Sequence, residues 1–390
     1  MTRVSGGLSA PLDPGSSWRD RLLAKRDRWL ADPRFQRWAA RFPLTRRIAA
    51  RRAAQLFDLC AGFVYSQVLA ACVRLRLFDA LADGPRTVEW VALRAQLDPE
   101  AARCLLDAAV SLGLLERRGT GSYGLGELGA ALRGNPGIVA MVEHHALLYA
   151  DLADPLALLR GTRDGQRLAA YWPYATADDP ARLTTGDVDA YTRLMSASQP
   201  LVAQDVLEAY DFARHRCLLD VGGGDGTFLC AVAERAPRLA LQLFDLPAVA
   251  AQAEARFAAR GLAGRARCTG GSFRSDELPR GADVVSLIRV LHDHDDAPVL
   301  DLLQRVCRAL GPGGTVVIGE PLAEASGDGS MRDAYFGLYL RAMGSGRPRS
   351  ARQLGEMLGR AGFTDIRQVR TDRPLLTGVV TARVRPGAGM

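Results

Sequence analysis

The chain has 390 residues, of which 48% are hydrophobic, and this is enough apolar side chain to bury the cores of two or three domains. Its seven cysteines form no C-x-x-C pair, which argues against a disulfide framework and a zinc ribbon. The net charge of +7 is concentrated near the N-terminus, where twelve Arg and Lys residues but only three Asp lie between Arg19 and Arg52.

The sequence indicates neither membrane insertion nor export. The longest apolar stretch, from Leu59 to Val73, contains Ser66 and Gln67 and is shorter than the roughly 18 uninterrupted apolar residues of a membrane span. We interpret it as a buried or dimer-forming helix. Because the N-terminus also lacks the layout of a signal peptide, and the thiols are expected to be reduced, we expect a cytoplasmic protein.

The composition and the hydrophobic pattern change three times along the chain. We therefore divide it into four parts: a basic aromatic arm (1–50), a winged-helix-like domain (51–140), a helical linker (141–213) and a C-terminal domain of alternating strands and helices (214–390).

The arm carries three of the five tryptophans. Asp32 and Pro33 predict a helix start, with the aspartate as N-cap. Phe35, Trp38 and Phe42 then recur on one face of that helix, and arginines occupy the other face. An aromatic stripe beside arginines fits a helix that lies on a membrane surface, and it also fits packing on the protein's own core. Both alternatives remain open.

The second part contains two short helices, "TVEWVALRAQL" and one that begins at Asp98-Pro99, followed by the wing-like "GSYGLGELGAAL". Winged-helix patterning raises the alternative of a DNA-binding regulator. However, the second helix is mostly Ala, Leu and Val, and it offers only Arg103 for contact with bases or phosphates. We therefore expect no nucleic-acid partner and a homodimer.

After the linker, whose segment 171–180 ("YWPYATADDP") reads as an aromatic loop, strands and helices alternate. The predicted strands are 216–221, 239–245, 282–291, 314–320, 366–371 and 375–384, and the predicted helices are 227–236, 247–261, 298–310 and 350–362. This alternation predicts an α/β fold: a Rossmann-like, doubly wound, mostly parallel sheet with an antiparallel last strand.

A glycine loop follows the first of these strands in "LLDVGGGDGTFL". Gly222, Gly224 and Gly226 allow a tight turn and a close approach of a ligand to the backbone. A dinucleotide fingerprint requires glycine at 227, where Thr227 stands. Asp245, at the end of the second strand, can accept hydrogen bonds from both hydroxyls of a ribose. The combination favours an adenosine ligand, and S-adenosylmethionine more than NAD.

These motifs, together with "GGSF", "RVLHD" and "VVIGEP", resemble the small-molecule O-methyltransferases of the caffeate and acetylserotonin type over roughly residues 55–385. Within that family, "FDLCAGFVYSQVLAACVRLRLFDAL" and "GADVVSLIRVLHDHDD" look most like the carotenoid enzymes that methylate a tertiary 1-hydroxyl, of the demethylspheroidene and hydroxyneurosporene type. The resemblance implies an S-adenosylmethionine-dependent enzyme that acts on a small hydrophobic alcohol.

The resemblance also implies roles for individual residues. His292 matches the general base and Glu320 the carboxylate that orients it. The implied cofactor-binding residues are Gly222, Gly224, Asp245, Gly271, Ser272, Phe273 and Arg289.

The chain departs from the family at three positions. Gly271 stands where an aspartate usually reaches the adenine amino group, so Ser272 or the backbone must substitute. The second glutamate that supports the base falls on Pro348, which leaves only Glu320 in that role. His294 stands where a tryptophan usually follows "HD".

The pair His292-x-His294 also fits other interpretations. A metal site is disfavoured because the spacing of the remaining histidines recommends none as a further ligand, so we predict no metal. A solvated loop that caps the next helix explains the aspartates from 293 to 296, yet it leaves unexplained a histidine directly after an apolar run. We assign His292 as the base and give His294 no role.

Other functions remain as alternatives to carotenoid O-methylation. A methyltransferase for a phenolic, polyketide or tetrapyrrole substrate would share every cofactor residue. An NAD oxidoreductase is disfavoured by Thr227, and a winged-helix regulator by the apolar second helix. The arginine-rich arm would suit peripheral contact with a membrane, where carotenoids are found.

Overall fold

The computed structural model describes residues 17–119, 121–161, 165–172, 174, 180–323, 331–373 and 376–387. The chain forms two compact units, Met1–Ala71 and Cys72–Met390. The seven cysteines are all free thiols.

The first unit is helical. It contains α1 (Trp18–Ala31), α2 (Pro33–Arg41) and most of α3 (Arg46–Arg74). The predicted start of α2 is confirmed, since Asp32 Oδ1 accepts a hydrogen bond from Arg34 N at 2.7 Å. The rings of Phe35, Trp38 and Phe42 follow one another along α2, with centroids 5.7 and 4.9 Å apart.

In the part of the chain that the structure describes, α3 is long and apolar enough to cross a membrane by length and composition. Only 17% of its apolar window is buried. The exposed apolar side chains along it include those of Phe57, Leu59 and Phe63. One such helix is weak evidence for a span, because helices that pair with another subunit have the same composition.

The winged-helix pattern is borne out at the start of the second unit. A three-stranded sheet in the order β1-β3-β2 packs with short helices. The elements are α4 (Leu77–Ala80), β1 (Arg86–Thr87), α5 (Val88–Ala95), α6 (Pro99–Ser111), β2 (Leu115–Arg118), β3 (Ser122–Leu125) and α7 (Glu127–Arg133). Asp98 caps α6 as expected, and the helix buries Ala102, Leu106 and Ala109.

The predicted α/β fold is confirmed by a seven-stranded sheet in the order β6-β5-β4-β7-β8-β10-β9. Its strands are β4 (Cys217–Val221), β5 (Ala240–Asp245), β6 (Ala266–Gly270), β7 (Val284–Ile288), β8 (Thr315–Glu320), β9 (Phe363–Val369) and β10 (Gly378–Val384). The first five run parallel, and β10 is antiparallel to both β8 and β9. Every residue of β7 and β8 is buried, as is usual for parallel strands covered on both faces.

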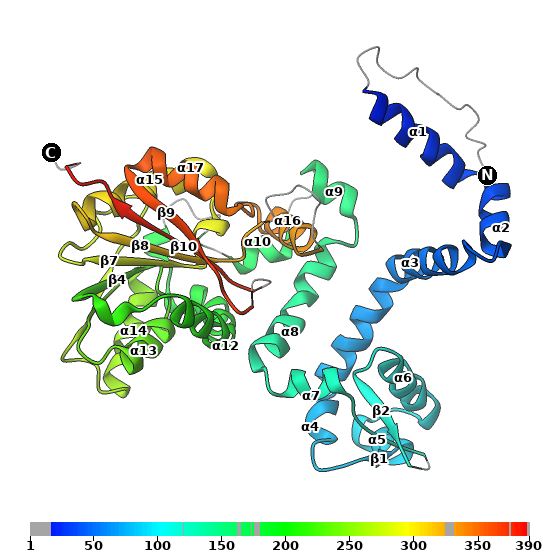
Figure 1. The fold of residues 1–390 in the computed structure, drawn as a ribbon. Helices are drawn as coiled ribbons and strands as arrows, with labels where there is room; N and C mark the ends of the chain where they lie inside the picture. The colour runs from blue at the N-terminus through cyan, green and yellow to red at the C-terminus, as the bar shows by residue number, and fades with distance from the viewer. Residues whose placement is uncertain are drawn as a thin grey trace. The chain divides into compact units, whose positions relative to one another are not determined.

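Helices cover both faces of this sheet (Figure 1). One face packs against α12 (Thr185–Ala209), α13 (Thr227–Arg235) and α14 (Pro247–Ala259), and the other against α15 (Asp296–Leu310) and α17 (Ala351–Ala361). The strand order reverses between β4 and β7, so a ligand site is expected where these two strands end.

The linker region is helical, as predicted, and contributes α8 (Pro136–Asp151), α9 (Pro155–Arg160) and α10 (Arg167–Tyr171). Together with α16 (Met331–Met343) these helices enclose a cluster that includes Leu148, Leu158 and Trp172. The aromatic loop predicted at 171–180 lies mostly outside the described residues.

One strand was missed by the sequence patterns. The strand β6 pairs parallel with β5 at the edge of the sheet, and four of its five residues are not buried. An edge strand of this kind carries no continuous apolar run, and the hydrophobic pattern therefore gives no signal for it.

Candidate active site

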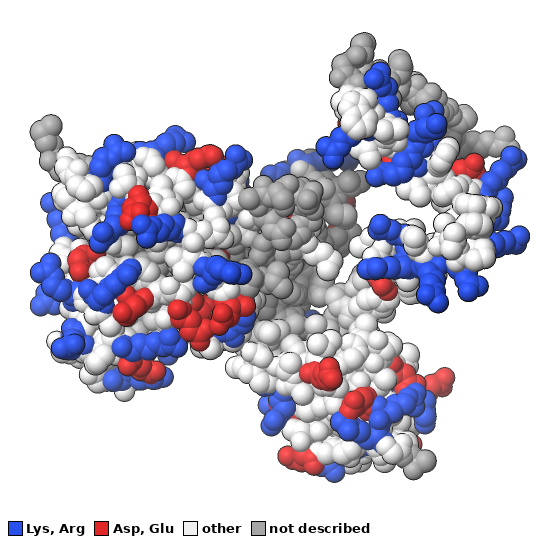
Figure 2. Space-filling view, in the orientation of Figure 1, with Lys and Arg blue, Asp and Glu red and all other residues white. Residues whose placement is uncertain are grey.

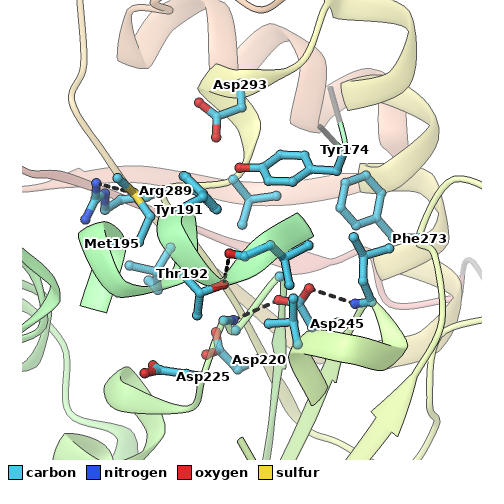
Figure 3. A pocket seen from close by; sticks show the side chains of 18 of the residues that line it. Tyr174, Tyr191, Thr192, Met195, Asp220, Asp225, Asp245, Phe273, Arg289 and Asp293 are labelled. Carbon is cyan, nitrogen blue, oxygen red and sulfur yellow. Dashed lines mark hydrogen bonds between the residues drawn. The ribbon is translucent and has the colours of Figure 1, made fainter. Parts of the chain in front are cut away.

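A cavity opens at the carboxyl ends of the parallel strands (Figure 3). All of the predicted cofactor-binding residues line it: Gly222, Gly224, Asp245, Gly271, Ser272, Phe273 and Arg289. Residues separated by up to 67 positions in the sequence are thus brought together, because the parallel strands that precede them end at the same edge of the sheet.

The glycine loop leads directly from β4 into α13. Gly222 and Gly224 have φ angles of 69° and 61°, a conformation that other residues rarely adopt. A side chain at Gly222 would lie 2.7 Å from Val290 Cγ2, whereas the space beside Gly224 is open. The loop therefore offers bare backbone to a ligand at Gly224.

Asp245 ends β5 and faces this loop. Its Oδ2 accepts a hydrogen bond from Gly224 N at 2.8 Å, and its Oδ1 accepts one from Leu246 N at 2.7 Å. Burial raises the pKa of Asp245 to about 6, although these two backbone donors lower it. The carboxylate is thus held in place while each oxygen keeps a lone pair for a ribose hydroxyl.

Asp220 is a site residue that sequence reasoning missed. It lies in the middle of the sheet, where its Oδ1 accepts a hydrogen bond from Ser286 Oγ at 2.6 Å. Its Oδ2 is buried and has no hydrogen-bond partner among the described residues, and Asp220 is one of the residues that line the cavity. Burial raises the pKa of Asp220 to about 7. A buried carboxylate oxygen without a partner favours a ligand that brings a donor or a positive charge.

A carboxylate that the sequence motifs did not reveal lies beside Gly271 and Ser272, which line the cavity. A side chain on Gly271 would lie 2.8 Å from Phe244 Cζ and 3.0 Å from Asp276 Oδ2. The same Asp276 oxygen accepts a hydrogen bond from Ser272 N at 2.8 Å. The structure therefore places an acid beside the glycine that replaces the family's aspartate, five positions further along the chain.

Arg289 follows β7 with a φ of 61°. Its guanidinium donates to Ser198 Oγ at 2.8 Å and to Met195 Sδ at 2.8 Å, both uncharged acceptors. Among the described residues, no carboxylate lies within ion-pair distance of this guanidinium. A cation with only neutral partners in a cavity is suited to bind the carboxylate of an amino-acid ligand.

His292 and Glu320 are brought together as the resemblance implied, and both are buried. Glu320 Oε1 accepts hydrogen bonds from the backbone N–H groups of Leu291, at 2.5 Å, and His292, at 3.2 Å. The same oxygen lies 3.7 Å from His292 Nδ1, an ion-pair distance that is too long for a hydrogen bond. Glu320 therefore holds the backbone around the histidine more tightly than it holds the imidazole.

The other imidazole nitrogen faces the next residue. His292 Nε2 lies 3.1 Å from Asp293 Oδ1, and Asp293, not His292, forms the cavity wall in the described part of the chain (Figure 3). Burial alone would lower the pKa of His292, but the charges of Asp293 and Glu320 outweigh it and raise that pKa. Burial raises the pKa of Asp293 to about 6. A proton can therefore lie on the imidazole of His292 or on the carboxylate of Asp293, and the two groups titrate as a pair.

His294 also lines the cavity, where its ring meets that of Phe273 edge to face at 5.2 Å. Burial and the neighbouring Arg274 lower the pKa of His294 to about 3, so the ring is neutral at physiological pH. Among the described residues, no group of three or more His, Cys, Asp and Glu side chains is placed to hold a metal ion. His294 is thus a neutral aromatic wall of the cavity.

The helix α16 (Met331–Met343) contributes both to the core and to the surroundings of His292. Leu340 and Met343 are buried in the helical cluster, while the ring of Phe336 lies 6.4 Å from that of His292. Tyr335, next to Phe336, shares a hydrogen bond of 2.7 Å with His145 Nε2 of α8. An aromatic surface therefore begins directly beside the predicted base.

Comparison with known families agrees with this geometry. Residues 165–364 match the O-methyltransferase domain, and residues 57–134 match the O-methyltransferase dimerisation domain. The chain belongs to the O-methyltransferase family. It is an S-adenosylmethionine-dependent O-methyltransferase, and its dimerisation domain supports the predicted homodimer.

The methyltransferase has similar relatives over most of its length. It is 47% identical to demethylspheroidene O-methyltransferase of Cereibacter sphaeroides over 90% of this chain and 92% of that protein. It is 42% identical to the enzyme of the same name from Rhodobacter capsulatus, over 88% of this chain and 85% of that protein. The crystal structure of human N-acetylserotonin methyltransferase with its cofactor is similar, with a TM-score of 0.69, 26% identity and coverage of 86% and 98%.

The residues of the cavity fit S-adenosylmethionine. Asp245 offers acceptors for the ribose and Gly224 offers open backbone. Within the described ranges, Arg289 offers a cation without an acidic partner and Asp220 a buried oxygen without a hydrogen-bond partner. The individual roles of these residues, and those of His292 and Glu320, remain predictions.

The pairing of His292 with Asp293 leads to a first expected result. Replacing Asp293 with asparagine removes the nearest negative charge, so the pKa of His292 falls. Since a general base acts in its unprotonated form, the acid limb of the pH profile of kcat/KM moves to lower pH. Asp301→Asn, on the exterior of α15, is the matched control and leaves the profile in place. An acid limb unchanged by Asp293→Asn contradicts the pairing.

Proposed function

We propose that this methyltransferase methylates the tertiary 1-hydroxyl of an acyclic carotenoid, as a step of carotenoid biosynthesis. The observation that carries the proposal is a buried histidine between the cofactor cavity and an aromatic helix, in a chain 47% identical to a demethylspheroidene O-methyltransferase. The same geometry provides a base for the hydroxyl and an apolar wall for the hydrocarbon.

The cofactor supplies a methyl group on a positively charged sulfur. The chain supplies proton transfer and alignment. The alcohol must lose its proton as its oxygen attacks, and the imidazole of His292 accepts that proton directly or through Asp293 at 3.1 Å. A tertiary alcohol is a weak acid, so we expect the proton to leave late, and holding the oxygen in line supplies much of the acceleration.

Exclusion of water also follows from the residues around the base. Phe336 lies against His292, and the ring of Tyr174 lies near Asp293 in the cavity (Figure 3). Such surroundings favour methyl transfer from a sulfonium to a neutral alcohol, because the positive charge on sulfur is dispersed in the transition state. The products are a neutral thioether and a neutral ether, and the proton passes to the pair of His292 and Asp293.

The substrate is tested by incubating the enzyme with methyl-labelled S-adenosylmethionine and a panel of lipophilic alcohols in detergent. We expect label in an acyclic carotenoid that carries a tertiary hydroxyl and none in the same hydrocarbon without it. Mass spectrometry of the extracted product shows the added methyl group as an ether. Label in phenols or tetrapyrroles, with none in the carotenoid, contradicts the proposal and favours the alternative substrates.

We further propose that the protein is cytoplasmic and that the N-terminal arm contacts a membrane surface. Figure 2 shows Lys and Arg gathered over α1, α2 and the start of α3, with few Asp or Glu. Large apolar side chains are exposed among them, including Trp29 at 59% and Trp38 at 50%. Arginines and tryptophans together are the composition of helices that lie in the headgroup region of a bilayer.

Removing the aromatic side chains of the arm is expected to weaken binding to vesicles of phosphatidylcholine and phosphatidylglycerol. Each fully buried aromatic side chain contributes about 1.5–3 kcal/mol, so Trp29→Ser with Trp38→Ser, which removes about 3 kcal/mol or more, lowers the partition coefficient at least about 150-fold. Trp90→Ser, an exposed tryptophan of the second unit, is the matched control. Equal sedimentation of the intact and the arm-deleted protein contradicts this proposal.

A further inference from the structure

The residues that hold the base in place are not all in the motifs that carry the chemistry. His292 lies in the segment 291–296, here called the base loop, which follows β7 and ends at the first residue of α15. A second segment, 344–350, here called the strap, links α16 to α17 and packs against the base loop. Gly346 in the strap has no room for a side chain, since a Cβ there would lie 2.2 Å from His292 O.

Arg349 makes the main contacts between the two segments. Its side chain is fully buried, with 0% exposed. Nη1 donates to Leu291 O at 2.8 Å, and Nη2 donates to His294 O at 2.7 Å and to Asp296 Oδ1 at 2.7 Å. One guanidinium thus holds the carbonyl groups on both sides of His292.

The base loop is therefore fixed from two sides. Glu320 Oε1 accepts the N–H groups of Leu291 and His292, while Arg349 donates to the carbonyl groups of Leu291 and His294. In addition, Ser345 Oγ donates to Asp293 O at 2.8 Å. Because both N–H and C=O groups of the base loop have hydrogen-bond partners, the loop has little freedom to shift, and the imidazole of His292 is held in place with it.

This arrangement bears on the glutamate that the chain lacks. The resemblance places the family's second supporting carboxylate at Pro348, next to Arg349. We propose that Arg349 is a positioning residue for methyl transfer, which fixes His292 through the backbone of the base loop where a second carboxylate is missing. The inference rests on the proposed role of His292 as the base.

The position of the imidazole matters for rate because proton transfer requires the nitrogen within hydrogen-bond reach of the hydroxyl. A displacement of about 1 Å costs on the order of a hundredfold in rate. The charged and titratable groups that face His292 are Asp293, Glu320, Arg289 and His294, and α16 adds the uncharged Phe336. A shift of the base loop changes the distances of His292 to these groups, and therefore its pKa.

The test compares three variants of the full-length enzyme. Arg349→Met keeps the volume of the side chain and removes its donors, and Arg349→Lys retains the charge and one donor. Arg347→Met is the matched control, because Arg347 pairs with Asp296 at 2.7 Å and is 42% exposed. Both kcat and KM are measured with the best acceptor found for the wild type. We expect kcat to fall about 100-fold in Arg349→Met, with partial recovery in Arg349→Lys and no change in Arg347→Met.

A second measurement needs no substrate and separates this inference from the proposed function. The five histidines are labelled with ¹³C at Cε1, His292→Ala assigns the signal of His292, and its pKa is followed by NMR. We expect the pKa of His292 to change in Arg349→Met and to remain unchanged in Arg347→Met. If the wild-type enzyme methylates no carotenoid, the proposed substrate is wrong, but the titration still tests the role of Arg349.

If Arg349→Met does not fold, Ser345→Ala and Arg349→Lys provide the same two readouts with smaller effects. A folded Arg349 variant with wild-type kcat and an unshifted pKa of His292 overturns the inference. A fall in thermal stability with both readouts unchanged assigns Arg349 to the fold alone and likewise overturns it.

Discussion

Replacing His292 with alanine is expected to lower kcat by a factor of about 10²–10⁴ while leaving the affinity for S-adenosylmethionine unchanged. His292 lies outside the cavity wall formed by Asp293 and His294, so its removal deletes no cofactor contact. The loss falls on proton transfer, because Asp293, whose pKa burial raises to about 6, is a weaker base than an imidazole with a raised pKa. Single-turnover methyl transfer and calorimetric titration with S-adenosylhomocysteine measure the two quantities separately.

His294→Phe is the control for the His292 experiment. His294 is also buried and lines the cavity, yet its pKa of about 3 leaves it unable to accept a proton at neutral pH. Phenylalanine keeps an aromatic ring against Phe273, so kcat should remain within a few fold of the wild type. If His292→Ala retains full turnover, or if His294→Phe loses as much as His292→Ala, the assignment of the base is wrong.

Replacing Asp245 with asparagine is expected to weaken cofactor binding about a hundredfold. Hydrogen bonds to a charged group contribute about 1.5–3 kcal/mol each, and in the predicted role Asp245 would accept one from each of two ribose hydroxyls. Wild-type affinity should also fall as the pH drops below the pKa of about 6 that burial gives this carboxyl, because the ionised form is the better acceptor. Titration calorimetry with S-adenosylhomocysteine between pH 5 and 8 measures both effects.

Asp225→Asn provides a comparison on the same loop. Asp225 lines the cavity, but its carboxylate is already engaged by Thr227 Oγ1 at 2.7 Å and by Arg256. Its replacement should therefore cost much less affinity and should leave the pH dependence of binding in place. Equal losses for the two variants, or a pH dependence that persists in Asp245→Asn, contradict the ribose assignment.

Much of the fold follows from local patterns in the sequence. The continuous apolar runs of β4, β7 and β8 and the alternation with amphipathic helices were sufficient to predict a doubly wound sheet. The same logic located the ligand site, because residues directly after parallel strands lie at one edge. Local patterns failed for β6, whose position depends on pairing with β5 and not on its own hydrophobicity.

The site was predictable where residues are adjacent in sequence to strand ends and unpredictable where contacts are long-range. Asp220 looked like part of a buried strand, and only its Oδ2, which has no partner in the described part of the chain, and its place beside the cavity mark it as a site residue. Asp276 lies beside Gly271, and Arg349 donates hydrogen bonds to the base loop. Both residues lie in irregular connections, and no local sequence pattern predicts how such a connection runs. The resemblance therefore showed that the family's carboxylates are missing at Gly271 and Pro348, but it did not show which side chains lie near these two positions.

The base loop is held through its amide groups, with Glu320 on one side and Arg349 on the other. Main-chain atoms are the same whatever amino acid is encoded, so the side chain at 294 can be exchanged without loosening these contacts, whereas Asp295 and Asp296 contribute their carboxylates to the anchorage. That tolerance explains how histidine can occupy position 294, where related enzymes usually carry tryptophan. It also makes 294 an attractive position for directed evolution toward new acceptors, whereas Gly346 should resist every replacement.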